Sequence, residues 1–186
     1  MAKRVLGIDP GLTRCGFGLV SASKGRSVGF IEVGVLQSSP DGELSQRIFE
    51  IGKQVEALLD RLKPDAVAIE RVFSQQNLKT VVSVANITGV IAYLCLSRGV
   101  PVQYFTPTQV KAAVTGSGRA NKAQVSSMVM KILKLQEVPK TADANDALAI
   151  AITASWRNDF GLESAPMTNA QQKWQDAENA AKKRQR

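Results

Sequence analysis

The chain has 186 residues, enough for one domain with a hydrophobic core of its own. Hydrophobic residues make up 44% of it and charged residues 22%, which is typical of a soluble globular protein. It has no histidine, which excludes His-based catalytic triads and His-based metal sites. The net charge of +8 favours a polyanionic partner, with nucleic acid ahead of a membrane surface.

The basic charge is unevenly distributed along the chain. No Asp or Glu occurs from residue 71 to residue 136, although solvated surfaces usually mix both signs. The basic residues of this acid-free stretch are Arg71, Lys79, Arg98, Lys111, Arg119, Lys122, Lys131 and Lys134. A solubilising surface is the simpler interpretation, but the length of the stretch favours nucleic-acid binding.

The two cysteines and the hydropathy of the chain indicate where in the cell the protein is located. Cys15 and Cys95 are far apart and fit two buried thiols in a reducing cytoplasm. No secretory signal precedes the first apolar run. The most apolar stretch, residues 81–96, is too short and too polar to span a bilayer. We therefore expect a cytoplasmic protein without a membrane partner.

The first elements in chain order are strands. Residues 4–9 form a buried strand that Pro10 and Gly11 end. Residues 15–21 and 27–36 are two further strands, with the hairpin at residues 23–25, so an antiparallel meander is predicted. Residues 43–62 have apolar side chains at helical spacing, and residues 66–70 read as a short buried strand of the parallel type.

The second half alternates helices with one more strand. Length favours a helix over residues 78–97, and residues 100–105 form the fifth strand. Thr106, followed by Pro107 and Gln109, is a helix start, and that helix ends near residues 116–118. Asn121 caps the next helix, and residues 142–156 form the last. Residues 1–157 are therefore predicted to be one domain and residues 158–186 a mobile basic tail.

This order predicts an α/β protein with a mixed five-stranded sheet flanked by helices: three antiparallel strands, then parallel additions. It is the element order of the RNase H-like fold. A right-handed crossover would set the fourth strand beside the first. Asp9 and Glu70 would then lie at neighbouring strand ends.

Four acidic residues stand out: Asp9, Glu70, Asp143 and Asp146. Asp9 is also explained as a turn former before Pro-Gly, and the two Asp residues as ordinary acids in a first helical turn. Glu70 is harder to explain, because it ends an apolar run. Carboxylates that converge repel one another unless cations intervene. Two Mg²⁺ ions would relieve that repulsion and assemble a phosphodiesterase site that needs no protein base.

Five segments, in order, resemble one family. They are Gly7-Ile8-Asp9-Pro10-Gly11, Ala68-Ile69-Glu70-Arg71-Val72-Phe73, Gln109-Val110-Lys111, Gly116-Ser117-Gly118 with Asn121-Lys122-Ala123-Gln124-Val125, and Ala142-Asp143-Ala144-Asn145-Asp146-Ala147-Leu148-Ala149-Ile150-Ala151. The chain resembles the RuvC family, the Holliday-junction resolvases of bacteria, over about residues 4–157. One such motif is weak, whereas five in register are specific.

The resemblance implies an RNase H-like homodimer that acts on four-way junction DNA. It would make two symmetric nicks with 5′-phosphate and 3′-hydroxyl ends, together with the RuvA–RuvB branch-migration complex. Asp9, Glu70, Asp143 and Asp146 would hold two Mg²⁺ per subunit, with Mn²⁺ as a substitute. The implied DNA-binding residues are Phe73, which would stack on unpaired bases, Lys111, Arg119 and Lys122.

The chain also departs from the family pattern. Some relatives have a His in place of Asp143 or near the position of Ala154, and Asn145 stands where a small apolar residue is common. Three other functions stay open: an actin- or sugar-kinase-like ATPase, a YqgF-type ribonuclease and a non-catalytic junction-binding module. An ATPase of that kind needs two such domains, and this chain is long enough for one. We place the dimer interface on the helix at residues 78–97.

Overall fold

The computed structural model describes residues 2–71 and 78–157, with side chains of the second range from residue 81. The elements in chain order are β1 (Lys3–Asp9), β2 (Arg14–Ala22), β3 (Val28–Gln37), α1 (Leu44–Leu62), β4 (Ala66–Glu70), α2 (Leu78–Leu96), β5 (Val102–Phe105), α3 (Pro107–Thr115), α4 (Lys122–Leu133) and α5 (Ala142–Trp156). A short 3-10 turn, Lys24–Arg26, joins β2 to β3. Every predicted element within the described ranges is present, with boundaries shifted by at most two residues.

The five strands form one mixed sheet in the order β3-β2-β1-β4-β5. β1 pairs antiparallel with β2, and β2 with β3. β1 pairs parallel with β4, and β4 with β5. The predicted meander with parallel additions is thus confirmed. β1 and β4 are buried along most of their length, which explains their continuous apolar runs.

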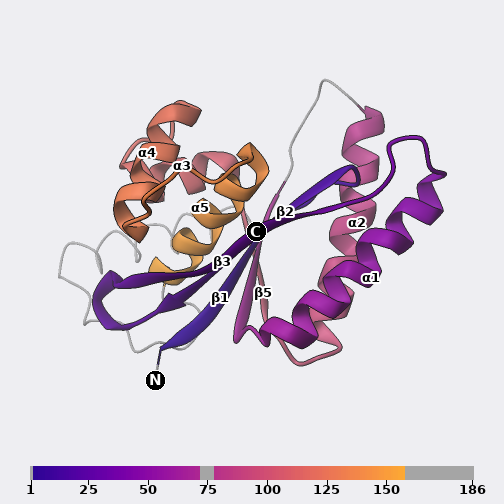
Figure 1. Cartoon of the computed structure of the whole chain (residues 1–186), viewed down its shortest axis with the longest axis horizontal. Helices are drawn as coiled ribbons and strands as arrows, with labels where there is room; N and C mark the ends of the chain where they lie inside the picture. The colour runs from indigo at the N-terminus through magenta and orange to yellow at the C-terminus, as the bar shows by residue number, and fades with distance from the viewer. Residues whose placement is uncertain (1, 72–77, 158–186) are drawn as a thin grey trace, which may run out of the picture.

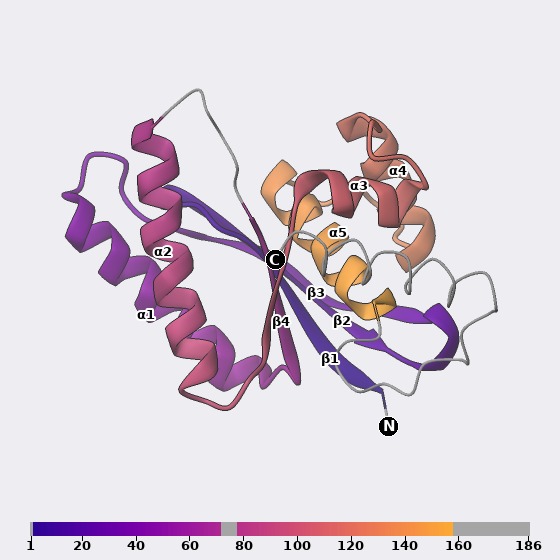
Figure 2. The same cartoon turned by 180° about the vertical axis from the view of Figure 1, so that it is seen from behind.

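Helices cover both faces of the sheet. In Figures 1 and 2, α1 and α2 lie on one face, and α5 lies on the other beneath α3 and α4. Alternate strand residues feed the two cores: Leu6, Ile8 and Ile69 pack toward α1 and α2. Val5 and Ala68 pack toward α5. The alternation follows from the two-residue period of a strand.

Three glycines let α5 lie directly on the sheet. A Cβ added at Gly7 would overlap the backbone of Ala147, and one added at Gly16 would overlap the backbone of Asp143. At Gly18 an added Cβ would lie 2.8 Å from the backbone nitrogen of Leu148. These glycines therefore fix the height and direction of α5, which carries two of the four acidic residues.

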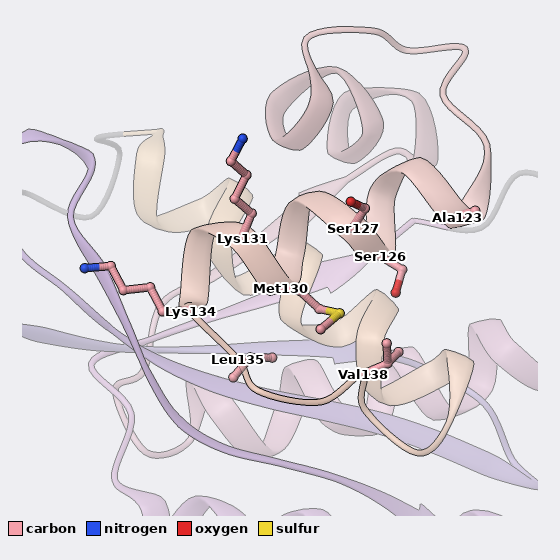
Figure 3. Close-up of a pocket in the computed structure, with 8 residues that line it drawn as sticks. All are labelled: Ala123, Ser126, Ser127, Met130, Lys131, Lys134, Leu135 and Val138. Carbon is pink, nitrogen blue, oxygen red and sulfur yellow. The ribbon is translucent and has the colours of Figure 1, made fainter.

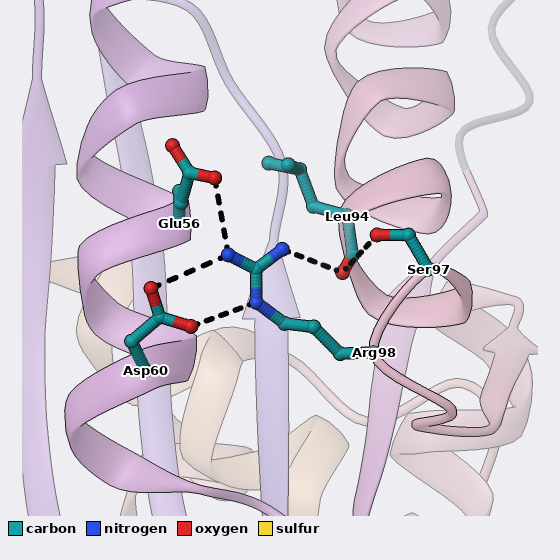
Figure 4. A network of polar contacts seen from close by, with 5 residues as sticks. All are labelled: Glu56, Asp60, Leu94, Ser97 and Arg98. Carbon is teal, nitrogen blue, oxygen red and sulfur yellow. Dashed lines mark hydrogen bonds and ion pairs between the residues drawn. The ribbon is translucent and has the colours of Figure 1, made fainter.

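An arginine network joins α1 to the end of α2 (Figure 4). The Arg98 guanidinium donates from Nε to Asp60 at 2.8 Å and from Nη2 to Glu56 at 3.0 Å. It also donates from Nη1 to the Leu94 carbonyl at 3.2 Å. Arg98, a basic residue of the acid-free stretch, thus has acidic partners on α1. Within the described ranges, no helix is long and apolar enough to cross a membrane.

Candidate active site

Asp9 and Glu70 lie side by side at one edge of the sheet. Each is the last residue of its strand, and Ile8 is paired with Ile69 in the parallel ladder of β1 and β4. Both side chains point to the α5 face, because they follow Gly7 and Ala68 by two residues. Asp9 and Glu70 are close enough for each to influence the pKa of the other. The expected neighbourhood of these two carboxylates is confirmed.

The first turns of α5 bring the other two carboxylates to the same edge. The Thr141 hydroxyl caps the helix by accepting a hydrogen bond from the Ala144 backbone N–H at 3.3 Å. Asp146 lines a cavity of about 320 Å³ together with Asp9 and Glu70. Asp143 does not line that cavity, although it is close enough for its charge to raise the pKa of Asp9. The four acidic residues thus gather at one edge, three of them around one cavity.

The carboxylates perturb one another's protonation. Burial, followed by the charges of Glu70, Asp146 and Asp143, raises the pKa of Asp9 to about 7. Burial and the charge of Asp146 also raise the pKa of Glu70, against the charges of Lys122 and Lys111. Each therefore holds a proton more readily than an exposed acid does. A cluster with these properties is a candidate functional site.

Two lysines come to the cavity from α3 and α4. Lys111 and Lys122 both line it. A capping box at each helix start sets their position: Thr106 with Gln109 for α3, and Asn121 with Gln124 for α4. Lys122 is the first residue of α4, where the helix dipole disfavours a cation. Its Nζ lies 3.5 Å from Asp146 Oδ2. The attraction to this carboxylate offsets the unfavourable interaction with the helix dipole.

The motif analysis missed one site residue, Arg14. Its Nε donates to Asp143 Oδ2 at 2.6 Å, which is the shorter of the two ion pairs at this edge. Arg14 begins β2, and it lies five residues after Asp9 in the chain. Its place at this edge could have been predicted, because β2 pairs antiparallel with β1 and begins at the edge where β1 ends, but its partner Asp143 could not.

Of the other two predicted DNA-binding residues, the structure describes only Arg119. Arg119 does not line the carboxylate cavity but a neighbouring hollow between α3 and α4, which Thr115, Asn121 and Gln124 also line. Phe73 lies outside the described residues, as does the predicted tail from residue 158. A further hollow lies along α4 and the loop after it, lined by Lys131, Lys134 and Val138 among others (Figure 3).

The donor chemistry of the edge fits a hard divalent cation. All four candidate ligands are carboxylates, and their mutual repulsion is what a bound cation would relieve. As the side chains lie, however, no three acidic, Cys or His residues within ranges 2–71 and 78–157 are close enough to form a ready metal site. Arg14 and Lys122 already pair with Asp143 and Asp146. A cation would therefore need side-chain movements that release these two carboxylates.

Comparison with known proteins identifies the family. The family model described as "Crossover junction endodeoxyribonuclease RuvC" matches residues 5–154. The chain belongs to the RuvC family. A RuvC of the same description from Paenarthrobacter aurescens is 48% identical over 188 residues, covering 99% of this chain and all of the relative. The one from Saccharopolyspora erythraea is 53% identical over 154 residues, covering 83% and 77%.

Solved structures agree with this assignment. The Thermus thermophilus RuvC in complex with a Holliday junction substrate has a TM-score of 0.80 at 34% identity, covering 86% of this chain and 96% of that one. A second structure of T. thermophilus RuvC has a TM-score of 0.76 at 36% identity, covering 83% and 95%. The yeast mitochondrial resolvase Ydc2, at 16% identity and a TM-score of 0.61, covering 86% and 82%, shares the fold. The predicted RNase H-like fold is confirmed.

Proposed function

We propose that this RuvC-family chain resolves Holliday junctions by hydrolysing one phosphodiester bond in each of two opposed strands. The products would carry 5′-phosphate and 3′-hydroxyl ends. One observation supports the site above all: family membership coincides with Asp9, Glu70 and Asp146 around one cavity that two lysines also line. A phosphodiesterase needs both features, cation ligands for catalysis and positive charge for the phosphate.

Asp9, Glu70, Asp143 and Asp146 would hold two Mg²⁺ ions, with Mn²⁺ as a substitute. When bound, these ions supply Lewis acidity at the phosphate and an activated water. Asp9 has to lose its proton to act as a ligand, and its raised pKa of about 7 sets the pH at which this happens in the cation-free protein. No imidazole takes part in proton transfer, because the sequence contains no His.

Lys111 and Lys122 would neutralise the scissile phosphate. Lys122 is 80% exposed and weakly paired with Asp146, so it is free to move to an incoming phosphate oxygen. Lys111 lies on α3 and is partly buried. Arg119, at the adjacent hollow, would contact the backbone further along one arm. Phe73 keeps its proposed role of stacking on unpaired bases.

A homodimer would place two such sites on a two-fold symmetric junction. Val82, Tyr93 and Leu96 on α2 are 49%, 70% and 62% exposed. They lie along one side of the helix, since 11 and 14 residues are close to whole turns. Tyr93→Glu should give monomers in sedimentation velocity. Val138→Glu, at an apolar residue that is 55% exposed on the opposite side of the sheet, should stay dimeric; a dimeric Tyr93→Glu would refute this placement.

The wider setting follows from the same proposal. The enzyme would act in the cytoplasm on junctions that the RuvA–RuvB complex moves. The free, buried thiols of Cys15 and Cys95 are compatible with a reducing compartment. Dependence on the partner is measurable, because RuvA–RuvB should increase resolution of a junction whose homologous arms allow branch migration.

The test of the proposed site is cleavage of a synthetic four-way junction by isosteric variants. Glu70→Gln and Asp146→Asn should abolish Mg²⁺-dependent cleavage and leave junction binding intact, with a binding constant that falls as salt rises. Asp41→Asn, which removes an exposed carboxylate outside the site, should cleave like the wild type. Wild-type rates for Glu70→Gln would contradict the ligand assignment. Cleavage of RNA in preference to the junction would favour the YqgF-type ribonuclease.

A further inference from the structure

The shorter of the two ion pairs at the carboxylate edge joins Arg14 to Asp143. The proposed reaction gives Arg14 no role. Arg14 Nε lies 2.6 Å from Asp143 Oδ2, and the two side chains are 45% and 29% exposed. Lys122 and Asp146 are 3.5 Å apart, a much weaker contact. The carboxylate oxygens of Asp143 would coordinate a divalent cation, but one of them, Oδ2, is already paired with the Arg14 guanidinium.

The backbone brings this pair together. Arg14 and Gly16 are two residues apart on β2, so their Cα–Cβ directions share the α5 face. Gly16 has no Cβ, and the backbone of Asp143 occupies the space that a Cβ would take. The first turn of α5 thus lies directly on β2 beside Arg14. The pair is therefore set by the strand and the helix rather than by two free surface chains.

Arg47 of α1 and Ser38 of the loop before α1 hold the turn that precedes Arg14. The Ser38 hydroxyl donates to the Leu12 carbonyl at 2.6 Å. Arg47 donates from Nη2 to the Thr13 hydroxyl at 2.6 Å and from Nε to the Ser38 hydroxyl at 3.3 Å. These contacts fix the chain on the N-terminal side of Arg14, so its guanidinium starts from a defined position.

The pairing has an electrostatic counterpart in the rest of the cluster. Of the three carboxylates that raise the pKa of Asp9, Asp143 has the smallest effect. Asp143 is also not among the groups that shift the pKa of Glu70. Asp143 also lies outside the cavity that the other three carboxylates line. Its carboxylate is thus the one held apart, and Arg14 is the group that holds it.

We propose that Arg14 is a positioning residue that occupies the Asp143 carboxylate in the cation-free protein and has to release it when a divalent cation binds. The inference rests on the proposed role of Asp143 as a ligand. The exchange involves no covalent step, because Asp143 exchanges a guanidinium for a metal ion. Arg14 therefore competes with the cation, and removing the guanidinium strengthens cation binding.

Mn²⁺ binding to the DNA-free protein, followed by the electron paramagnetic resonance signal of free Mn²⁺, measures this directly. Arg14→Gln should bind Mn²⁺ about fivefold more tightly, the size expected for a partly exposed ion pair. Arg14→Lys, which keeps the charge, should lie closer to the wild type. Arg61→Gln removes the same charge from an arginine–carboxylate pair with Glu32, away from the cluster, and should change Mn²⁺ affinity by less than twofold.

A double-mutant cycle separates competition from long-range charge. In an Asp143→Asn background the Arg14→Gln effect should vanish, because the competing contact is already gone. An effect of the same size in that background would mean that Arg14 acts only through its distant charge. Weaker or unchanged Mn²⁺ binding by Arg14→Gln would overturn the proposal, as would a wild type and a variant that both bind no Mn²⁺.

Nuclear magnetic resonance gives a second readout without any variant in the measured protein. The Nε–H signal of Arg14, assigned by its loss in Arg14→Lys, should shift on saturation with Mg²⁺. The Nε–H of Arg98 also donates to a carboxylate, Asp60, and should stay in place. An unmoved Arg14 signal contradicts the exchange. Asp146→Asn distinguishes failure of the proposed metal site from failure of the proposed role of Arg14. If Asp146→Asn binds Mn²⁺ like the wild type, the metal site itself is wrong, whatever the result for Arg14.

Discussion

Replacing Asp9 by Asn should stabilise the cation-free protein against unfolding, and the gain should grow as pH rises. Burial and three neighbouring carboxylates raise the pKa of Asp9 from 3.8 to about 7. The folded state therefore binds a proton that the unfolded chain has already lost between these pH values. The contribution of Asp9 to folding stability therefore falls as the pH rises from about 4 to about 7, and it stays constant at higher pH.

The magnitude follows from the two pKa values. A tenfold difference in proton affinity corresponds to about 1.4 kcal/mol, so ionised Asp9 costs the wild-type fold about 4 kcal/mol above pH 7. More than half of that cost develops between pH 5 and pH 7. Asn has nearly the same shape and does not ionise, so Asp9→Asn avoids the cost. The difference in unfolding free energy between the two proteins should therefore widen over this range.

Urea unfolding in EDTA at pH 5, 6, 7 and 8 measures the difference. Asp41→Asn, at an exposed carboxylate, controls for the lost negative charge. Adding Mg²⁺ should stabilise the wild type, by about 2.7 kcal/mol at a hundred times the dissociation constant, and should leave Asp9→Asn unchanged. An Asp9→Asn protein that is no more stable than the wild type at pH 8 without cation would refute the electrostatic account of the cluster.

Three further changes test how the fold positions the site. Gly16→Ala should cost about 3 kcal/mol in urea unfolding, because its Cβ overlaps the backbone of Asp143, and an unchanged unfolding free energy would contradict this packing. Thr106→Ala should cost about 1 kcal/mol by removing the cap of α3, and an unchanged unfolding midpoint would contradict the capping box. Arg98→Ala should lower the melting temperature by separating α1 from α2, with a deficit that shrinks in high salt; a salt-independent deficit would point to packing instead.

Local patterns predicted most of the fold. Short apolar runs bounded by turn residues predicted the strands, and Pro10 with Gly11 marked the end of the first. The capping residues Thr106 and Asn121 fixed two helix starts because their chemistry is local. The placement of Glu70 beside Asp9 followed from the connection rules for parallel strands, which need no knowledge of side chains.

Long-range contacts were the part that the sequence could not supply. Arg14 and Asp143 are 129 residues apart, so no local pattern links them. The closeness of α5 to the sheet depends on Gly16, whose role is visible only once the helix that packs on it is known. Arg119 shares the acid-free stretch with Lys111 but faces a different hollow, because charge along the chain does not specify which side of a helix pair it reaches.

The most direct test of the account is to map the nicks that the wild-type protein makes in a mobile four-way junction with Mg²⁺. The account predicts one nick in each of two opposed strands at symmetric positions, with ends that DNA ligase seals without further processing. Nicks at unrelated positions, ends that ligase cannot join, or no cleavage of a junction that the protein binds would contradict it.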